Sequence, residues 1–495
     1  MPGSAWCKAF VAVVAVTLVL PGTAAAAKPP PKTGSLSQVG HEPLMSRGMN
    51  AAMAIHGDYA YIGSRTDGAH EGMPHGGIMV VDISDPSDPE LLTDEPLYAA
   101  TGESSRELRV WQSQEILIVL NTNCGGVGAH HCTGPSQNSF RFYDISGENA
   151  TTPRLIAELA QSTHEFFLWE DPQNPERALM YGGSAGSACS SPTAAVCAFR
   201  VWDISPVRMG QPPVTLFSGT HGYTRFPPFP APVQKPTGGL HSLSVSNDGS
   251  RAYFALLTGG FAVVDVSDFA AGVPNPQPRP ITLNEARPTW PGPGAHSAVK
   301  LWDRDWVWVS DEVYGTATGA DHGCPWGWAR MIDISDPTAP TVEAEYRLPE
   351  NDPSTCDDWN PPRTSYSAHN PTLTPHIAFS TWHSGGMQAV SIQRPHTPVQ
   401  LAEFFPEPLP EVMLEDPRLS SDPDTGRNEK VVMWSYPIIK DGLIYVVDLR
   451  NGLYVLEYKG AFEKEVARIG FLEGNSNQGD ALCFEPVGTA PGFCE

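Results

Sequence analysis

The chain has 495 residues and a formal net charge of −24, with 31 basic against 55 acidic side chains. This acidic balance excludes a nucleic-acid-binding or anionic-membrane-binding surface as the main function. The 46 glycines and 49 prolines are too many for a helical protein and too few for a disordered one. Length alone leaves about two to four domains or one large repeat array.

Residues 1–27 have the pattern of a secretory signal peptide. Lys8 precedes an apolar run, Ala9–Leu20, that is short for a membrane span, and Ala25–Ala27 offers small residues for cleavage before Lys28. An uncleaved anchor is the alternative. No second apolar run of spanning length follows, so we expect an exported, soluble protein that is secreted or periplasmic.

Eight cysteines follow the signal segment, and an even number in an exported chain is typical of disulfides. They form four pairs of neighbours in the sequence, which are the pairings we expect among the many that are open: Cys124–Cys132, Cys189–Cys197, Cys324–Cys356 and Cys483–Cys494. A zinc site is the alternative, which the lack of a C-x-x-C motif disfavours.

A short apolar strand that ends in Asp-Ile-Ser or Asp-Val-Ser recurs five times along the chain. The copies are Ile78–Ser84, Phe140–Ser146, Phe199–Ser205, Phe261–Ser267 and Ala329–Ser335, and two degenerate copies follow at Met387–Ile392 and Leu453–Tyr458. A first and a second strand precede each copy, as at Leu240–Val245 and Ala252–Leu257, and a Pro-rich turn and a fourth apolar stretch follow it.

Seven units of four short strands, with no long segment of 3.6-residue apolar period, predict an all-β chain. We expect a single seven-bladed β-propeller of four-stranded antiparallel blades, because radial repetition leaves few open strand edges. An open solenoid is the structural alternative, but its repeats are much shorter than these.

Two segments resemble LVIVD repeats, the motif of a group of secreted and surface bacterial propellers. They are Val80–Leu92 (VVDISDPSDPELL) and Met331–Tyr346 (MIDISDPTAPTVEAEY). The resemblance extends over five good copies and two weak ones, since the sixth unit has Ser391-Ile392-Gln393 and the seventh has Leu456-Glu457-Tyr458. It implies a propeller that acts as a binding or interaction scaffold.

The repeated aspartate is structural in this interpretation, because an Asp at a strand end accepts hydrogen bonds from the amides of the following turn. Closure of the ring needs one outer strand from a chain end, and both Leu36–Leu44 and Ala467–Leu472 are candidates. We therefore expect an N-terminal segment at 28–48 with a candidate closing strand, the propeller at 49–472, and a tail at 473–495.

Four successive units place a histidine at the start of the first strand: His164, His241, His296 and His369. The innermost strand of each blade lines the channel of a propeller, so one repeat position forms a ring around the axis. Neutral imidazole is a ligand for Zn, Cu or Fe, and a metal site needs several converging donors. The arrangement is similar to the four-histidine iron centre of carotenoid oxygenase propellers, with selenium-binding-type propeller oxidases as a further precedent. A ring of polar side chains that bind channel water is the alternative.

Three further residues are accessory candidates. Arg106 lies near the equivalent position of the second unit, and His383 and Glu312 end second strands from which they could join the ring. The residues directly after the four histidines, among them Glu165, are expected to point away from the channel because side chains alternate along a strand.

Two functions remain open from the sequence. The first is a scaffold, expected to be a monomer, that binds a small-molecule or protein ligand on the loop-rich face where the first strands begin. The second is an exported metal-dependent enzyme, an oxidoreductase or hydrolase, in which the four histidines hold one divalent metal ion (Zn, Cu or Fe) with an open position for water or dioxygen. Sequence motifs for nucleotide binding, serine hydrolysis and helical zinc sites are absent.

Overall fold

The computed structural model describes residues 32–66, 75–92, 103–123, 138–161, 163–183, 198–223, 239–290, 294–312, 327–352, 354, 365–416 and 431–477. The chain separates into two compact units, Met1–Pro31 and Lys32–Glu495, and every feature below belongs to the second. The expected signal peptide and all the cysteines lie outside the described residues, so the disulfide pairings stay predictions.

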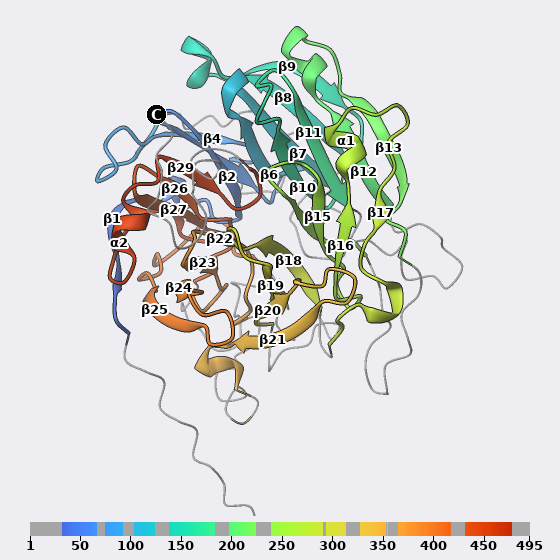
Figure 1. Ribbon diagram of the computed structural model, residues 1–495. Coiled ribbons are helices and arrows are strands. Elements are labelled where there is room, and N and C mark those ends of the chain that lie inside the picture. Colours follow the sequence, from blue (N-terminus) through green and yellow to red (C-terminus); the bar gives the residue numbers. More distant parts are fainter. Residues whose placement is uncertain are drawn as a thin grey trace, which may run out of the picture. The chain divides into compact units, whose positions relative to one another are not determined.

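The described strands form antiparallel sheets in which seven units of four strands follow one another along the chain (Figure 1). Units 1 and 2 are joined into one larger sheet by the pairing of Ser64 with Ser105. The all-β propeller class predicted from the repeats is confirmed by this organisation.

The strands of units 1 to 4 are β2 (Asn50–His56), β3 (Tyr59–Ser64), β4 (Met79–Asp82) and β5 (Glu90–Leu91); β6 (Glu103–Trp111), β7 (Ile116–Asn123), β8 (Ser139–Asp144) and β9 (Arg154–Leu159); β10 (Glu165–Glu170), β11 (Ala178–Gly183), β12 (Ala198–Asp203) and β13 (Val214–Thr220); and β14 (Ser242–Val245), β15 (Arg251–Ala255), β16 (Phe261–Asp265) and β17 (Arg279–Pro280).

The strands of units 5 to 7 are β18 (Ala295–Lys300), β19 (Trp306–Asp311), β20 (Ala329–Asp333) and β21 (Thr341–Tyr346); β22 (Pro371–Leu373), β23 (Ile377–Thr381), β24 (Met387–Ser391) and β25 (Val399–Phe404); and β26 (Ile438–Lys440), β27 (Leu443–Asp448) and β28 (Gly452–Lys459) with β1 (Ser35–Glu42). A further strand, β29 (Phe471–Glu473), pairs with β26. The helices of the described chain are short: α1 (Ser267–Ala270), α2 (Glu463–Val466) and the 3-10 turns η1 (Leu44–Ser46), η2 (Gln112–Gln114), η3 (Gly147–Ala150), η5 (Ser205–Met209), η6 (Asn284–Ala286) and η8 (Pro349–Asn351).

The first strands of consecutive units lie side by side. Contacts link β2 with β6, β6 with β10, β10 with β14, β14 with β18 and β18 with β22, and β2 also contacts β27 of unit 7. Unit 6 contacts unit 7 through β25 and β1, so the series of units returns to its start, as the propeller prediction requires.

Each sheet is buried on both faces because a neighbouring unit packs on each. In β4, Val80 packs with Leu108 of unit 2, while the next residue, Val81, packs with Tyr445 of unit 7. Both valines are fully buried. This explains why the repeat reads as a continuous apolar run rather than as an alternation of apolar and polar residues.

The repeated aspartate closes the turn after the third strand in each of the first five units. Its carboxylate Oδ1 accepts a hydrogen bond from the backbone amide two residues on, at 2.7–2.9 Å, in the pairs Asp82–Ser84, Asp144–Ser146, Asp203–Ser205, Asp265–Ser267 and Asp333–Ser335. The structural role expected for this residue is therefore confirmed.

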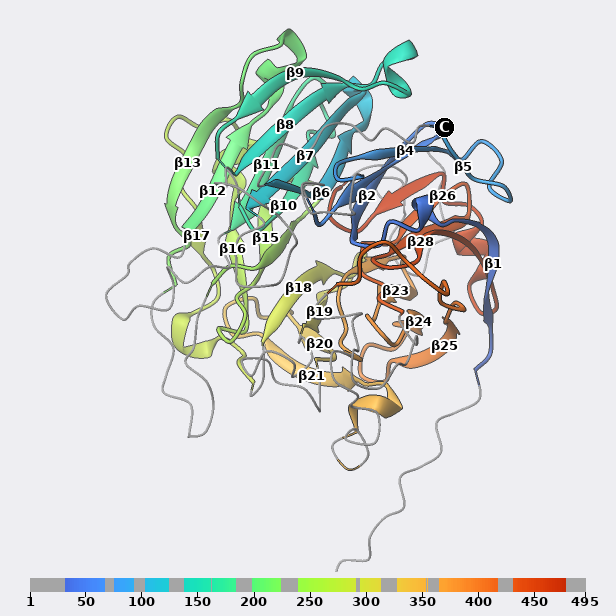
Figure 2. The ribbon, with the colours of Figure 1, turned by 180° about the vertical axis from the view of Figure 1, so that it is seen from behind.

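The N-terminal strand closes the ring. β1 pairs antiparallel with β28, with Leu36 opposite Tyr458 and Glu42 opposite Leu453, so it is the outer strand of unit 7. Figures 1 and 2 both show the blue β1 beside the red strands of this unit. The other candidate, Ala467–Leu472, is not an outer strand, since β29 pairs with the first strand β26 on the channel side.

The residues after β29 continue among the first strands, and we call Phe471–Asn477 the channel segment. Ser476 forms a parallel bridge with Leu168 of β10. The Asn477 side chain accepts a hydrogen bond from the Glu170 amide at 2.8 Å and donates one to the Glu170 carbonyl at 2.9 Å. The segment thus joins unit 7 to unit 3 across the channel.

A buried charge cluster forms where the channel segment passes β6. Arg109 Nη2 lies 3.3 Å from Glu107 Oε2, and Arg109 Nε lies 3.7 Å from Glu473 Oε1. All three side chains are buried, with one guanidinium between two carboxylates. Burial raises the pKa of Glu107 and of Glu473 to about 7, because Arg109 offsets only part of the desolvation.

This cluster predicts that the protein loses stability between pH 5 and 8. The folded state keeps a proton on Glu473 that the unfolded chain releases near its ordinary pKa of 4.5. This proton therefore contributes fully to the free energy of unfolding below that pH. Its contribution, on the order of 2 kcal/mol, is lost as the pH rises through 7. Urea unfolding at about pH 5.5 and 8 measures it, and Glu473→Gln should reduce the pH dependence. An unchanged dependence in this variant would contradict the assignment.

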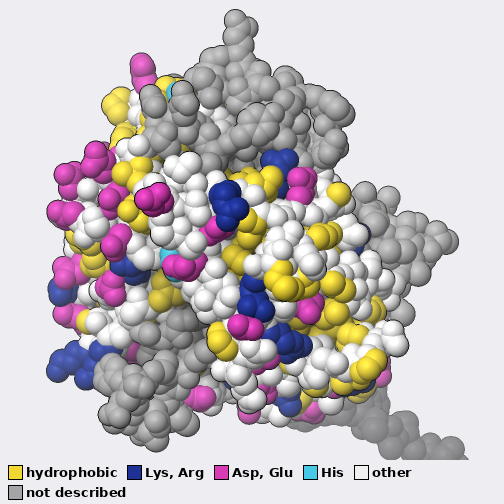
Figure 3. Space-filling model, turned by 90° about the horizontal axis from the view of Figure 1, so that it is seen from above, with side chains coloured by type: hydrophobic (Ala, Val, Ile, Leu, Met, Phe, Trp, Pro, Cys, Tyr) yellow, Lys and Arg dark blue, Asp and Glu magenta, His cyan; other side chains and the backbone are white. Residues whose placement is uncertain are grey.

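No helix of the described chain is long and apolar enough to cross a membrane. On the face seen in Figure 3, acidic side chains gather toward one edge, with Lys and Arg interspersed among the other side chains. The histidines discussed below contribute almost nothing to the surface, since those of units 4 to 6 are at most 6% exposed.

Candidate metal centre

The four predicted histidines begin the first strands of units 3 to 6 at the same end. His164 and His241 directly precede β10 and β14, His296 is the second residue of β18, and His369 lies two residues before β22. The backbone ladder fixes these positions, as where the His241 amide donates to the Ala255 carbonyl at 2.9 Å.

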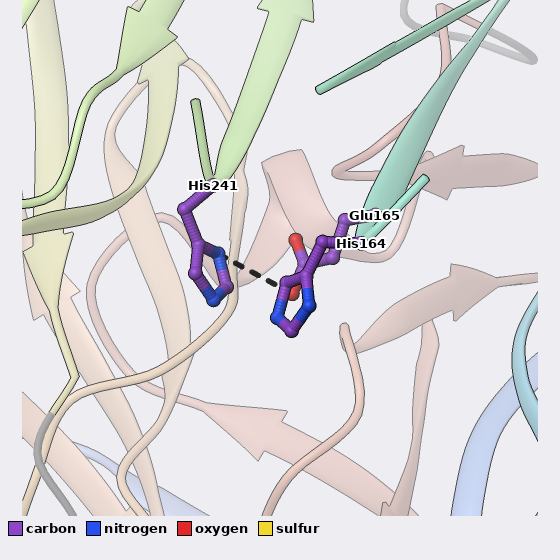
Figure 4. Close-up of side chains that lie close together, drawn as sticks. All are labelled: His164, Glu165 and His241. Carbon is purple, nitrogen blue, oxygen red and sulfur yellow. Dashed lines mark ion pairs between the residues drawn. The ribbon is translucent and has the colours of Figure 1, made fainter. Parts of the chain in front are cut away.

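The structure brings these side chains together. Ring centroids lie 4.3 Å apart for His164 and His241, 3.9 Å for His241 and His296, and 4.4 Å for His296 and His369. Figure 4 shows the first of these pairs, with the two imidazoles projecting toward each other from their strands. One position of the repeat thus produces a continuous row of imidazoles.

Glu312 and His383 lie inside this cluster. They follow the second strands β19 and β23, and the carboxylate of Glu312 is shared by three imidazoles. Glu312 Oε2 lies 3.2 Å from His296 Nε2, and Glu312 Oε1 lies 3.2 Å from His369 Nε2 and 3.3 Å from His383 Nε2. His383 has a backbone φ of +34°, a strained conformation that turns the chain back after β23.

Glu165 points toward the next unit, as alternation along its strand predicts, and it still reaches the imidazoles. Its side chain is 2% exposed, and its Oε1 lies 3.8 Å from His241 Nδ1 and 3.5 Å from His296 Nε2 (Figure 4). Glu165 leaves β10 toward the next unit, and at the narrow mouth of the channel this direction leads to the histidines of units 4 and 5. Alternation along the strand therefore does not remove it from the site.

The outer nitrogens of two imidazoles have hydrogen-bond partners. His369 Nδ1 lies 2.5 Å from the Trp434 carbonyl oxygen, which can only accept, so this nitrogen carries a proton. A neutral His369 ring then presents a lone pair at Nε2. His296 Nδ1 lies 2.7 Å from Ser297 Oγ, which helps to orient this ring.

Burial and neighbouring charges shift the pKa values of these histidines in different directions. Burial, with the nearby Arg106 charge, holds the pKa of His164 and His241 well below its usual range, and burial lowers that of His369 to about 3. Burial also opposes charge on His296, but Glu312 and Glu165 outweigh it and raise its pKa. The site therefore favours positive charge at one place, between His296 and Glu312.

Arg106 lies beside the imidazoles, where its charge helps to lower the pKa of His164. Its guanidinium carbon lies 5.6 Å from the centre of the Trp434 ring. Trp434, which unit 7 places at the ring position, stacks on His369 at 5.0 Å and 29°. Arg65 lies over the same indole at 5.3 Å.

Arg65 and the role of Glu165 escaped the sequence reasoning. Arg65 directly follows β3, as Glu312 follows β19. Comparing the ends of second strands across all units, as was done for the starts of first strands, would have found it. For Glu165 the sequence carries no such signal.

A cavity of about 530 Å³ lies near the opposite ends of the first strands. Its lining includes Ser244, Lys300 and Leu373 from units 4 to 6, and Ser476 of the channel segment. None of the predicted site residues lines it, so it is separate from the histidine cluster.

Comparisons with known proteins give a family for the repeats. The LVIVD repeat model matches residues 47–94 and 330–347. A search of curated proteins finds no match to this sequence.

Solved structures with a similar fold include several propellers. Saccharomyces cerevisiae Sqt1 has 10% identity and a TM-score of 0.48, with 86% of this chain and 100% of that chain covered. Chaetomium thermophilum Sqt1 bound to the N-terminus of ribosomal protein L10 has 15% identity and a TM-score of 0.42, covering 84% and 89%. The Cps50 (Swd1) β-propeller domain of Myceliophteria thermophila has 9% identity and a TM-score of 0.44, covering 86% and 99%.

The two matched segments contain the first and fifth copies of the Asp-Ile-Ser strand, from which the resemblance was inferred. The chain therefore contains two segments that match the LVIVD repeat model, within a β-propeller fold of seven four-stranded units.

Proposed function

We propose that this propeller binds one divalent transition metal ion at the mouth of its channel. The ligands would be the Nε2 atoms of His296, His369 and His383 and the carboxylate of Glu312. His241, His164 and Glu165 lie next to this set and complete the surroundings. The observation that carries the proposal is the convergence of three Nε2 atoms on one carboxylate, each within 3.3 Å.

The protonation of the rings explains why this convergence calls for a cation. With the proton at Nδ1, the Nε2 lone pair of a neutral His369 faces Glu312 Oε1 across 3.2 Å with no hydrogen between the two atoms. Such an arrangement repels unless a cation lies among the atoms. One proton would remove the repulsion at one of the three contacts with Glu312, whereas one metal ion would remove it at all three.

The donor set indicates the class of metal. Imidazole together with a carboxylate suits Zn, Fe, Cu or Mn rather than Ca or Mg, which prefer oxygen ligands alone. Partners at the outer nitrogens are typical of metal-bound histidines, since they orient the ring and raise its basicity. A bound ion with a free coordination position would supply Lewis-acid or redox chemistry, and Glu165 lies close enough to hold a proton during a reaction.

Export belongs to the same proposal, because the pattern of residues 1–27 supports it. The function is then that of an exported metal-binding propeller. The convergence of five imidazoles and two carboxylates favours metal binding over a scaffold that binds only a protein or a small molecule.

Elemental analysis of protein prepared without a histidine tag tests the proposal. We expect about one metal ion per chain in the wild type and less than about a tenth of that in a His296→Ala/His369→Ala variant. His396→Ala, which removes an exposed imidazole packed on Trp306, should keep the full content. A wild-type protein that holds no metal after growth in supplemented medium, and takes up none of the four metals on reconstitution, would refute it.

A further inference from the structure

We propose that a subsite next to the metal centre binds the carboxylate or phosphate group of an anionic ligand, held by Arg65 and Arg106 beside Trp434. The inference rests on the proposed function in one respect, since it names the class of substrate or co-ligand that the metal centre would receive. The binding of the anion itself needs only the arginines.

The first observation is the incomplete bonding of Arg65. Its side chain is 2% exposed, and neither Nε nor Nη1 has a hydrogen-bond partner in the described chain. The nearest carboxylate, Asp416 Oδ2, lies 3.5 Å from Nη2, where it contributes charge but no short hydrogen bond. A guanidinium remains charged even when buried, so its unused N–H groups are costly.

Two other buried arginines of this protein show how such groups can be satisfied within the chain. Arg450 Nε lies 3.0 Å from both oxygens of Glu415, and Arg450 Nη1 donates to the Leu409 carbonyl at 2.6 Å. Arg47 donates from Nε to Asn50 Oδ1 at 2.7 Å and from both terminal nitrogens to backbone carbonyls. Arg65 departs from this pattern, and an external acceptor would complete it.

The second observation is that two cations share one aromatic ring. The guanidinium carbons of Arg65 and Arg106 lie 5.3 and 5.6 Å from the centre of the Trp434 indole. The indole in turn stacks on His369, so the two guanidiniums lie one ring away from the metal centre. An anionic group bound beside the indole would be attracted by both guanidiniums.

The charges around the site agree with this assignment. The two guanidiniums and the carboxylates of Asp416, Glu165 and Glu312 leave one net negative charge when all are ionised. A divalent ion changes this to one net positive charge, which a singly charged anionic group would neutralise. A cationic ligand would be repelled by this net positive charge.

The shape of the donors selects the ligand group. A guanidinium presents parallel N–H groups that match the two oxygens of a carboxylate or phosphate. The subsite therefore predicts an anionic substrate rather than a neutral one.

Calorimetric titration with inorganic phosphate and with acetate tests the subsite, on metal-loaded protein and on protein treated with EDTA. We expect wild-type protein to bind at least one of the two anions in the millimolar range or tighter in both preparations. Arg65→Gln should weaken that binding at least about tenfold while its metal content stays at the wild-type level. Arg154→Gln, which removes a surface guanidinium paired with Asp144, should bind like the wild type.

The outcomes separate the two proposals. Anion binding that persists in metal-free protein and is lost in Arg65→Gln supports the subsite even if no metal is ever found. Equal binding by Arg65→Gln and the wild type, or no binding of either anion by the wild type, would overturn it. If Arg65→Gln does not fold, Arg65→Lys is the second variant. It keeps the charge but lacks the parallel N–H groups of the guanidinium, and it should still weaken binding at least about threefold.

Discussion

Replacing Glu312 by glutamine should weaken metal binding by at least about a hundredfold. Glu312 supplies the one carboxylate within 3.3 Å of three Nε2 atoms, so the variant keeps the volume and hydrogen-bonding groups of the side chain while it removes the charge and a ligand oxygen. The measurements are metal content and competition against a chelator. The melting temperature should respond to added metal in the wild type and much less in the variant.

The same variant distinguishes a metal centre from a buried ion pair. If Glu312 served only as the counter-ion of a protonated His296, the wild type would contain no metal, and Glu312→Gln would destabilise the fold by about 3–5 kcal/mol with or without chelator. Glu115→Gln is the matched control, because it removes a carboxylate that lies 3.3 Å from His56 at the surface. Neither metal content nor chelator sensitivity should change in the control.

The fold could be predicted from the sequence because five of the repeats contain a turn motif that depends only on neighbouring residues. In each of these turns, one carboxylate accepts a hydrogen bond from an amide two residues away. The motif is therefore recognisable in five copies, and the spacing between the copies gives the length of the repeat. Once the repeat is aligned, the propeller symmetry converts a sequence position into a ring. This is why the row from His164 to His369 was predictable, although the four residues are far apart in the chain.

Other features depend on contacts that no repeat encodes. Leu36–Leu44 and Ala467–Leu472 are both candidate outer strands in the sequence, and only the pairing of Leu36 with Tyr458 shows which of them closes unit 7. Glu165 obeys the alternation of its strand and still reaches the histidines, because the channel is narrow there. Arg65 and Trp434 meet across the junction of units 1 and 7, which lie at opposite ends of the sequence.

A protein that begins at Pro43 should be at least about 5 kcal/mol less stable than one that begins at Lys32, or should fail to fold. Removing β1 deletes the outer strand of unit 7 and its contacts with β25. It exposes Tyr454, on which His41 stacks at 4.2 Å, and leaves the whole edge of β28 unpaired. Urea unfolding compares the two proteins, and size-exclusion chromatography should show association of the shorter one through the open edge.

The shorter protein also tests whether closure of the ring supports the metal centre. All the proposed ligands lie in units 5 and 6, so the deletion removes no donor atom. Unit 7 nevertheless supplies the Trp434 carbonyl that fixes the His369 ring, and an open ring would leave this contact unsupported. We therefore expect a synthetic Lys32–Leu44 peptide, added in trans, to restore stability and metal affinity together. The prediction is contradicted if the two proteins have the same free energy of unfolding and the same metal affinity. Ring closure would then not stabilise the fold, and the seven units would hold together without the N-terminal strand.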